Sequence, residues 1–272
     1  MNVFITGAAG GLGRAMAVEC GKRGYNLFLT DVNEEGLRQM QTGLERRFDI
    51  AVTVKACDLT DPSSVDELLK TADAFGLRFD MLLNIAGVDF EGGFMTRDRE
   101  QIVKIVMLND AATLRITHAI LSRRRPNKRF SIVFVSSLAS LFPMPLKATY
   151  AASKRFILDF ATALREELAE QNATVLTLCP AGMVTKNDTI EAINAQGFFG
   201  AATTNALELV AKNTVTRALN GDAVYIPGGL NRSLAAIGKL LPRAGVAKII
   251  RMRWRKTQKK WLTESICGTP QT

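Results

Sequence analysis

Seven short apolar segments alternate with longer amphipathic stretches between residues 2 and 229, and this alternation constrains the fold more than any other feature. Each segment spans four or five residues, the length of a buried strand, and the stretches between them repeat apolar residues at helical spacing. We expect strands at residues 2–6, 26–30, 51–55, 80–83, 132–135, 174–178 and 223–227. Strands that alternate with helices favour a parallel sheet covered on both faces. The sequence therefore predicts the α/β class, with a doubly wound parallel sheet of seven strands in three α/β/α layers.

The net charge of the chain is concentrated in its last part. Residues 1–230 contain 25 lysines and arginines against 25 acidic residues, whereas residues 231–272 contain ten basic residues and one acid, so the net charge of +9 lies in this C-terminal extension. With 272 residues and 47% hydrophobic content, the chain can bury one large core. We therefore expect one domain over residues 1–230 and an extension over residues 231–272.

The extension has the pattern of a basic amphipathic helix. Apolar residues recur on one face and basic residues on another: Val246, Ile249, Ile250, Trp254 and Trp261 on the first, and Lys248, Arg251, Arg255 and Lys259 on the second. Such a helix suits peripheral contact with an anionic membrane surface. A helix that packs on the body or on a second subunit explains the pattern equally well, and the sequence leaves both open. The body is neutral and lacks an aromatic stacking pattern, so we expect no nucleic-acid partner.

Cysteine content and hydropathy bear on the compartment. The four cysteines show neither paired nor metal-type spacing, which fits a reducing compartment and a chain without a metal site. The chain opens on strand-like residues rather than on a charged leader, and no apolar run approaches the ~18 residues of a membrane span. We therefore expect a cytoplasmic protein, or one held at the membrane periphery through its extension.

A glycine-rich turn follows the first predicted strand. Residues 6–13 read Thr-Gly-Ala-Ala-Gly-Gly-Leu-Gly and run into a helix from Arg14. Such a turn lets the backbone approach a pyrophosphate, and the helix N-terminus offers N–H groups and the positive end of its dipole. The spacing departs from the Gly-x-Gly-x-x-Gly/Ala fingerprint, because Met16 occupies the last position. A glycine turn that only permits tight packing is the alternative.

The second predicted strand ends at Asp31, which lies 18 residues after Gly13. An acid at about this distance bonds the adenosine ribose hydroxyls in dinucleotide-binding folds. A carboxylate there would repel a 2′-phosphate, so Asp31 favours NAD over NADP. The other role open to Asp31 is the N-cap of the helix predicted over residues 33–47, and both roles are compatible.

A phenol and an ammonium lie four positions apart on one face of a predicted helix. The charge of Lys154 can lower the pKa of Tyr150 and make the phenol a general acid or base. Ser137 follows the fifth strand directly, 13 residues before Tyr150. Asn109 lies among apolar residues in a helical pattern over residues 98–121, where burial is costly without partners. The alternatives are a surface tyrosine with a solvated lysine, and an asparagine that faces solvent.

Taken in order, these motifs resemble those of the short-chain dehydrogenase/reductase family over residues 2–229. The matching residues are Thr6-Gly7-x-x-x-Gly11-x-Gly13, Asp58, Asn84-x-Ala86-Gly87, the tetrad Asn109, Ser137, Tyr150 and Lys154, and Pro180-Ala181-x-Met183-x-Thr185. Ile85 and Ala181 depart from the pattern, which has Asn and Gly there. The glycine turn also fits the longer epimerase and dehydratase branch, whereas chain length, the Asn-x-Ala-Gly motif and the serine–tyrosine spacing favour the shorter oxidoreductase branch.

The resemblance implies a Rossmann-type domain that transfers a hydride between a nicotinamide coenzyme and a secondary alcohol or ketone. Tyr150 would exchange a proton with the substrate oxygen, and Ser137 would hydrogen-bond that oxygen. Lys154 would lower the tyrosine pKa and bind the nicotinamide ribose, and Asn109 would hold a water that links Lys154 to solvent. We expect coenzyme contacts from Gly7, Gly11, Leu12, Gly13, Asp31, Asp58, Leu59, Asn84, Ala86, Gly87, Tyr150, Lys154, Pro180, Met183 and Thr185.

The remaining expectations concern substrate and assembly. Apolar residues follow Ser137 and Met183 in the sequence, which favours an apolar, steroid-like or fatty-acyl-derived alcohol or ketone. Residues 186–202 have weak periodicity and are interpreted as a mobile cover over the site, with a buried loop helix as the alternative. The family resemblance implies a homodimer or homotetramer. A non-catalytic NAD-sensing binding protein is the second hypothesis, and the complete tetrad argues against it.

Overall fold

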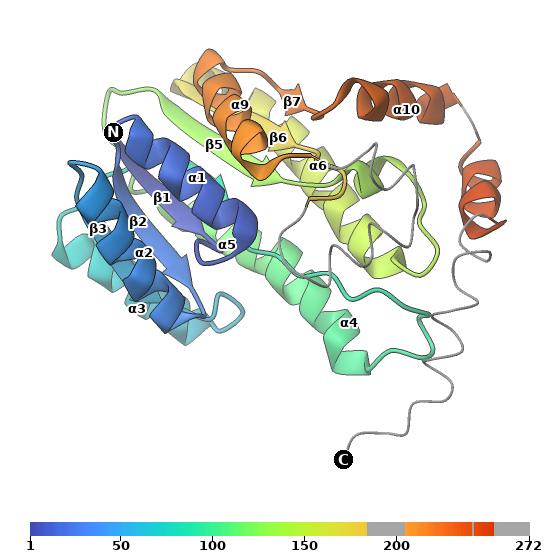
Figure 1. The fold of residues 1–272 in the computed structure, drawn as a ribbon, viewed down its shortest axis with the longest axis horizontal. Coiled ribbons are helices and arrows are strands. Elements are labelled where there is room, and N and C mark those ends of the chain that lie inside the picture. Colours follow the sequence, from blue (N-terminus) through green and yellow to red (C-terminus); the bar gives the residue numbers. More distant parts are fainter. Residues whose placement is uncertain (184–204, 241, 253–272) are drawn as a thin grey trace.

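The computed structural model describes residues 1–183, 205–240 and 242–252, and these form one parallel sheet with helices on both faces (Figure 1). The seven strands are β1 (Asn2–Thr6), β2 (Asn26–Asp31), β3 (Val52–Ala56), β4 (Met81–Asn84), β5 (Phe130–Val135), β6 (Ala173–Leu178) and β7 (Val224–Tyr225). They lie in the order β3-β2-β1-β4-β5-β6-β7, and every neighbouring pair is parallel. The predicted α/β class and seven-stranded Rossmann-type sheet are therefore confirmed.

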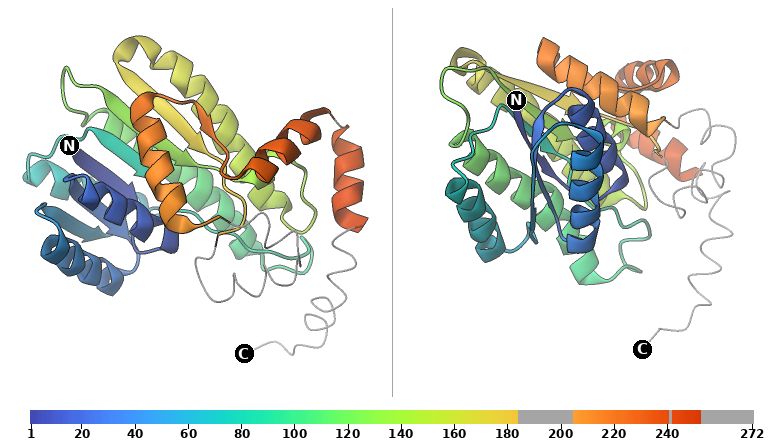
Figure 2. Two further views of the ribbon diagram at one scale, coloured as in Figure 1. Left: turned by 45° about the horizontal axis from the view of Figure 1, so that its top comes forward. Right: turned by 60° about the vertical axis from the view of Figure 1, so that its left-hand side comes forward.

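Two layers of helices cover the sheet (Figure 2). Those on one face are α1 (Gly11–Lys22), α2 (Glu34–Arg47) and α9 (Leu207–Asn220), and they share one hydrophobic core with the strands. Those on the other face are α3 (Pro62–Ala74), α5 (Thr113–Leu121) and α6 (Ala148–Glu167), and they share a second core. Because both faces are buried, the strands read as continuous apolar runs rather than as alternating ones.

The helical pattern over residues 98–121 contains a change of helix type. It comprises α4 (Arg99–Val106), a π-helical turn η1 (Met107–Ala112) and then α5. The π turn carries Asn109 and Asp110, and both side chains are buried. Single π turns inside α-helices occur frequently at functional sites, because the extra residue turns side chains in a direction that a regular helix does not allow.

The first part of the predicted extension packs on the body. Helix α10 (Gly229–Leu240) lies against the short 3-10 turn η2 (Leu138–Leu141), where Gly238 meets the ring of Phe142. Residues 243–252 are also helical, with Val246 buried and Ile249 and Met252 exposed. The two tryptophans of the predicted amphipathic helix lie outside the described residues, so contact with a membrane stays a prediction.

Two further sequence expectations bear on the described part of the chain. Within it, no helix has the length and hydropathy that crossing a bilayer requires. No group of three or more His, Cys, Asp or Glu side chains there could hold a metal ion. The segment over residues 186–202, interpreted as a cover over the site, lies outside the described residues.

Candidate functional site

The order of the strands reverses between β1 and β4, and ligands of open α/β sheets bind at the carboxyl ends of strands at such a point. Thr6 ends β1 beside Asn84, which ends β4. The Thr6 hydroxyl accepts the N–H groups of Ile85 at 3.0 Å and Ala86 at 3.2 Å. This side chain holds the chain that leaves β4 against the glycine turn that leaves β1.

The glycine turn is packed too tightly to admit a side chain at Gly7 or Gly13. Gly7 has a φ of +63°, and a Cβ there would lie 2.8 Å from the Cα of Ala86. A Cβ on Gly13 would lie 2.1 Å from the carbonyl oxygen of Gly7. Helix α1 begins at Gly11, and no side chain caps its N-terminal N–H groups. The turn therefore has both properties that the sequence suggested, tight packing and an uncapped helix N-terminus that fits a pyrophosphate.

Asp31 points at the same turn from the end of β2. Its Oδ2 accepts the N–H of Ala9 at 3.0 Å, and its Oδ1 accepts the N–H of Asn33 at 3.0 Å. The N-cap of α2 is Asn33, whose side chain accepts the N–H of Gly36 at 2.9 Å. The alternative that Asp31 itself caps α2 is therefore wrong, because Asp31 lies two residues before the cap. Its carboxylate is held at the edge of the glycine turn, where an adenosine ribose would lie.

Several other predicted coenzyme contacts have buried side chains. Leu12 and Leu59 belong to the two cores, and the amide of Asn84 donates to the hydroxyl of Thr117 at 2.9 Å. The side chains of these three residues therefore lie inside the protein. Asp58 is exposed beyond the end of β3, where hydrogen bonds from the hydroxyl and N–H of Thr60 lower its pKa.

The segment after β6 is only partly described. Pro180 is buried, and its carbonyl oxygen accepts the N–H of Leu138 at 2.8 Å. This bond holds the end of β6 beside the serine segment that follows β5. Met183 pairs with Asn205 in an isolated parallel bridge. Thr185 lies outside the described residues, so its predicted coenzyme contact stays a prediction.

The fold brings together the four residues of the predicted tetrad. Asn109 is 1% exposed, so the alternative that it faces solvent is wrong. Its Oδ1 accepts the N–H of Val88 at 2.8 Å, and its Nδ2 donates to the Val88 carbonyl at 3.0 Å and to the hydroxyl of Ser153 at 3.1 Å. A Cβ on Gly87 would lie 3.0 Å from Asn109 Oδ1 and 3.2 Å from Lys154 Nζ. Asn109 and Lys154 therefore converge on the glycine that follows β4.

Ser137 and Tyr150 form the second half of the tetrad. Ser137 caps the turn η2, where its hydroxyl accepts the N–H of Ala139 at 3.1 Å, and its side chain interacts with the Tyr150 phenol and lowers the pKa of that phenol. Tyr150 is partly buried, whereas Lys154 is 5% exposed. A solvated lysine, the alternative considered for this motif, is therefore excluded by the burial of Lys154.

The pKa of Tyr150 is raised, whereas the sequence predicted that Lys154 would lower it. Burial raises the pKa of the phenol, and the charge of Asp89 raises it further, while the interaction with Ser137 and the charge of Lys147 oppose these effects. The expected lowering by Lys154 is not found. The Lys154 ammonium lies 5.7 Å from the centre of the tyrosine ring and donates to the carbonyl of Val135 at 3.0 Å.

Lys154 is itself perturbed. Burial lowers its pKa to about 8, although the negative charges of Asp110 and Asp89 and the Cys179 thiol act in the opposite direction. A lysine with this pKa still carries its charge in most molecules at neutral pH. Because Lys154 donates to a strand carbonyl, its charge is held at the base of the site.

Asp110 is a buried acid that the sequence analysis missed. Burial raises the pKa of its carboxyl to about 6, and the charge of Lys154 only partly offsets this. Within the described residues, its Oδ1 is buried without a hydrogen-bond partner. The sequence does contain one sign of this site, the polar pair Asn109-Asp110 inside an apolar helical pattern. Consecutive residues of a regular α-helix point in different directions, so the pattern did not predict that both side chains are buried.

Lys147 was also missed, although it precedes the helix of Tyr150 and Lys154. Its ammonium lies 2.6 Å from a carboxylate oxygen of Asp89 and 3.0 Å from one of Glu91. Burial lowers the pKa of Lys147, but the two carboxylates outweigh burial and leave the pKa raised. Lys147 is therefore charged, paired with two acids and placed 5.7 Å from the centre of the Tyr150 ring.

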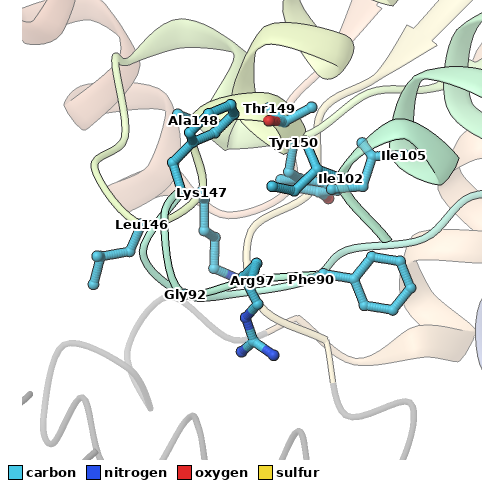
Figure 3. A pocket seen from close by; sticks show the side chains of 11 residues that line it. Phe90, Gly92, Arg97, Ile102, Ile105, Leu146, Lys147, Ala148, Thr149 and Tyr150 are labelled. Atoms are coloured by element: carbon cyan, nitrogen blue, oxygen red, sulfur yellow. The ribbon is translucent and has the colours of Figure 1, made fainter. Parts of the chain in front are cut away.

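A cleft opens beside Tyr150 (Figure 3). Its cavity volume is about 60 Å³, smaller than a typical ligand pocket, so a substrate here would extend beyond the cleft. Much of its lining is apolar and comes from the loop after β4, from α4, and from the start of α6 with the segment before it: Phe90, Phe94, Ile102, Ile105, Leu146 and Ala148. The sequence alone gives no reason to select the residues of the first two segments, because they are far from Tyr150 along the chain.

The fold and the site together define a nucleotide-binding α/β protein with a tyrosine–lysine–serine–asparagine group at the switch point of its sheet. Residues 1–195 match the family model described as short chain dehydrogenase. Because this match covers more than half of the chain, the chain belongs to the short-chain dehydrogenase/reductase family. The predicted family is therefore confirmed.

The chain is also similar to individual proteins. A very-long-chain 3-oxoacyl-CoA reductase of Laccaria bicolor is 30% identical over 175 residues, which are 63% of this chain and 51% of the relative. Human 17-beta-hydroxysteroid dehydrogenase type 3 is 30% identical over 178 residues, 65% of this chain and 57% of the relative. The chain thus spans about half the length of these curated relatives. A solved short-chain dehydrogenase from Sphingobium yanoikuyae in complex with NADPH is 25% identical with a TM-score of 0.74, covering 88% of this chain and 92% of that one.

Proposed function

We propose that this chain is an NAD(P)-dependent oxidoreductase that interconverts an apolar secondary alcohol and its ketone. The observation that carries the proposal is the position of Tyr150, which interacts with the Ser137 side chain and borders an apolar cleft at the edge of the sheet that holds the glycine turn. The similarity to a 3-oxoacyl-CoA reductase and to a hydroxysteroid dehydrogenase supports a substrate with a large apolar part.

The described residues fit a dinucleotide. Gly7 and Gly13 allow the backbone of the turn to pack closely, and the N-terminus of α1, which no side chain caps, faces the same turn. When bound there, the coenzyme supplies or accepts the hydride. Asp31 would bond the adenosine ribose hydroxyls and repel a 2′-phosphate, which supports NAD. The similar Sphingobium structure holds NADPH, so the choice between the two coenzymes has to be measured directly.

The raised pKa of Tyr150 supports a role for its phenol as proton donor. A phenol with a raised pKa keeps its proton at neutral pH, and reduction of a ketone requires a proton at the carbonyl oxygen. Ser137 would share that oxygen through its own hydroxyl. Lys154 would contribute positive charge at the base of the site, and Asn109 would hold Val88 and thereby the floor of the site in place.

The proposal is tested by following the reduced-nicotinamide absorbance with NADH and NADPH over a panel of ketones that includes steroids and 3-oxoacyl thioesters. Tyr150→Phe should lower kcat by at least about 100-fold, because it removes the transferred proton. Tyr25→Phe is the matched control, since Tyr25 lies between α1 and β2 at the opposite edge of the sheet and should leave kcat unchanged. Turnover by Tyr150→Phe at the rate of the parent would refute the assignment.

Assembly and location stay predictions. We propose a homodimer or homotetramer on the family resemblance alone, which light scattering of the purified protein would check. We also propose a cytoplasmic protein with peripheral membrane contact, and the exposed basic and apolar residues around residues 243–252 support the membrane contact. Failure of the intact chain to bind anionic liposomes at low salt would refute that contact.

A further inference from the structure

The cleft beside Tyr150 has one charged lining residue that forms no ion pair in the described part of the chain. Arg97 is exposed on the loop between β4 and α4 and lines the cleft together with Tyr150. Figure 3 shows its side chain beside Lys147 and Phe90, with the guanidinium pointing away from Tyr150. Among the described residues, no ion pair and no side-chain hydrogen bond involves Arg97. An unpaired guanidinium at an apolar cleft is a site for an anion.

Three acids near Arg97 are already engaged, and one of them is the adjacent Asp98, which caps α4 by accepting the N–H of Gln101 at 3.0 Å. Asp89 and Glu91 lie on the same loop, and both carboxylates pair with Lys147, at 2.6 Å and 3.0 Å. Lys147 is therefore paired within the protein, in a cluster of one cation and two acids, whereas Arg97 forms no ion pair among the described residues. The cleft thus has two lining cations, Lys147 within a cluster of ion pairs and Arg97 without an ion pair.

The loop also leaves room for the Arg97 side chain beside Gly92. Gly92 has a φ of +149°, and a Cβ there would lie 2.2 Å from the Nε of Arg97. The absence of a side chain at Gly92 therefore makes room for the guanidinium. The N–H of Gly92 donates to the carbonyl of Leu146 at 2.8 Å, and the N–H of Arg97 donates to Gly93 at 3.2 Å. These bonds tie the loop to the segment before α6 and fix where the side chain starts.

We propose that Arg97 binds an anionic group, a carboxylate or a phosphate, at the end of the substrate remote from the reacting carbon. This inference rests on the proposed function, because it needs the substrate carbonyl at Tyr150. The apolar walls of Phe90, Ile102 and Ile105 then receive the carbon chain between the two ends. The planar fork of a guanidinium matches both anions with two parallel hydrogen bonds. The substrate is thereby an amphiphile, apolar around the carbonyl and charged at its far end.

A binding experiment tests the proposal without turnover. Octanoate and octanol are titrated by calorimetry into the full chain at low ionic strength, for the parent and for Arg97→Gln. The parent should bind octanoate more tightly than octanol, and Arg97→Gln should weaken octanoate tenfold or more while octanol changes less than twofold. Arg99→Gln is the matched control, because Arg99 is exposed two residues further on and does not line the cleft.

Two kinetic comparisons distinguish the carboxylate from the phosphate. One pairs a medium-chain keto acid with its methyl ester, and the other pairs a 3-oxoacyl-CoA with the N-acetylcysteamine thioester of the same acid. Arg97→Gln should raise KM tenfold or more for the charged member of one pair, with kcat and the neutral member unchanged. Equal effects on charged and neutral members, or unchanged octanoate binding, would overturn the proposal. If the parent turns over none of these ketones, the proposed function fails, while the octanoate titration still decides the role of Arg97.

Discussion

The packing of the glycine turn predicts that replacing glycine by alanine has opposite effects on stability at two helical positions. In Gly13→Ala, the new Cβ would lie 2.1 Å from the Gly7 carbonyl oxygen and 2.8 Å from the Cα of Ala8. Both neighbours are backbone atoms, so no side chain can rotate away to relieve the clash. In Gly43→Ala, on the exposed side of α2, the new Cβ meets nothing within 4 Å. The same substitution should therefore have opposite effects at the two positions.

The magnitudes follow from packing and helix propensity. Alanine gains about 0.5–1 kcal/mol over glycine inside a helix, and Gly43→Ala should keep all of this gain. Overpacking against fixed atoms costs about 1–3 kcal/mol, and the very short contact puts Gly13→Ala at the upper end of that range. We expect a net loss of about 2 kcal/mol for Gly13→Ala. At roughly 2–4 °C per kcal/mol, Tm should fall by about 4–8 °C, while Gly43→Ala should raise it by about 1–4 °C.

Thermal unfolding followed by circular dichroism measures both variants against the parent. A titration with NADH, followed by its fluorescence, gives a second reading, because the displaced turn should bind the coenzyme at least about tenfold more weakly. Gly43→Ala should bind like the parent. If Gly13→Ala melts at or above the parent temperature, the turn is not packed against Gly7 as described, and the reasoning is refuted.

Three further predictions concern charged side chains. The pKa of Asp110 is raised to about 6 from an ordinary 3.8. Between these two pH values the folded state holds a proton that the unfolded chain releases. The free energy of unfolding should therefore fall by up to about 3 kcal/mol as the pH rises from 3.8 to about 6. Denaturant unfolding at pH 4 and pH 7 should show a smaller fall for Asp110→Asn, and an equal fall would contradict the pKa. Asp31→Ser should raise the ratio of kcat/KM for NADPH over NADH at least about tenfold, since it removes the charge that repels a 2′-phosphate, and an unchanged ratio would reject this role. Asp80→Ala should cost about 2–3 kcal/mol, because the buried carboxylate binds Arg125 through two hydrogen bonds, whereas Asp73→Ala at an exposed pair should cost under about 1 kcal/mol, and equal losses in chemical unfolding would contradict the difference in burial.

The sequence by itself determined the sheet and the order of its motifs. Parallel strands that are buried on both faces must be apolar along their whole length, so residues 2–6 and 132–135 could be recognised without neighbours. The positions of Gly7, Ser137 and Tyr150 followed, because the carboxyl ends of parallel strands share one edge. These inferences depend on local patterns and on a topology that allows few alternatives.

The tertiary structure alone decided the surroundings of these residues. The sign of the Tyr150 pKa depends on burial and on Asp89, which is 61 residues away in sequence and reaches the site through the loop after β4. The burial of the Asp110 side chain depends on a π turn, which the spacing of apolar residues in the sequence does not predict. Arg97 forms no ion pair among the described residues, while Asp89 and Glu91 of its loop pair with Lys147 from the segment before α6. Coulomb interactions and desolvation depend on distance in space rather than along the chain, so only the folded chain reveals them.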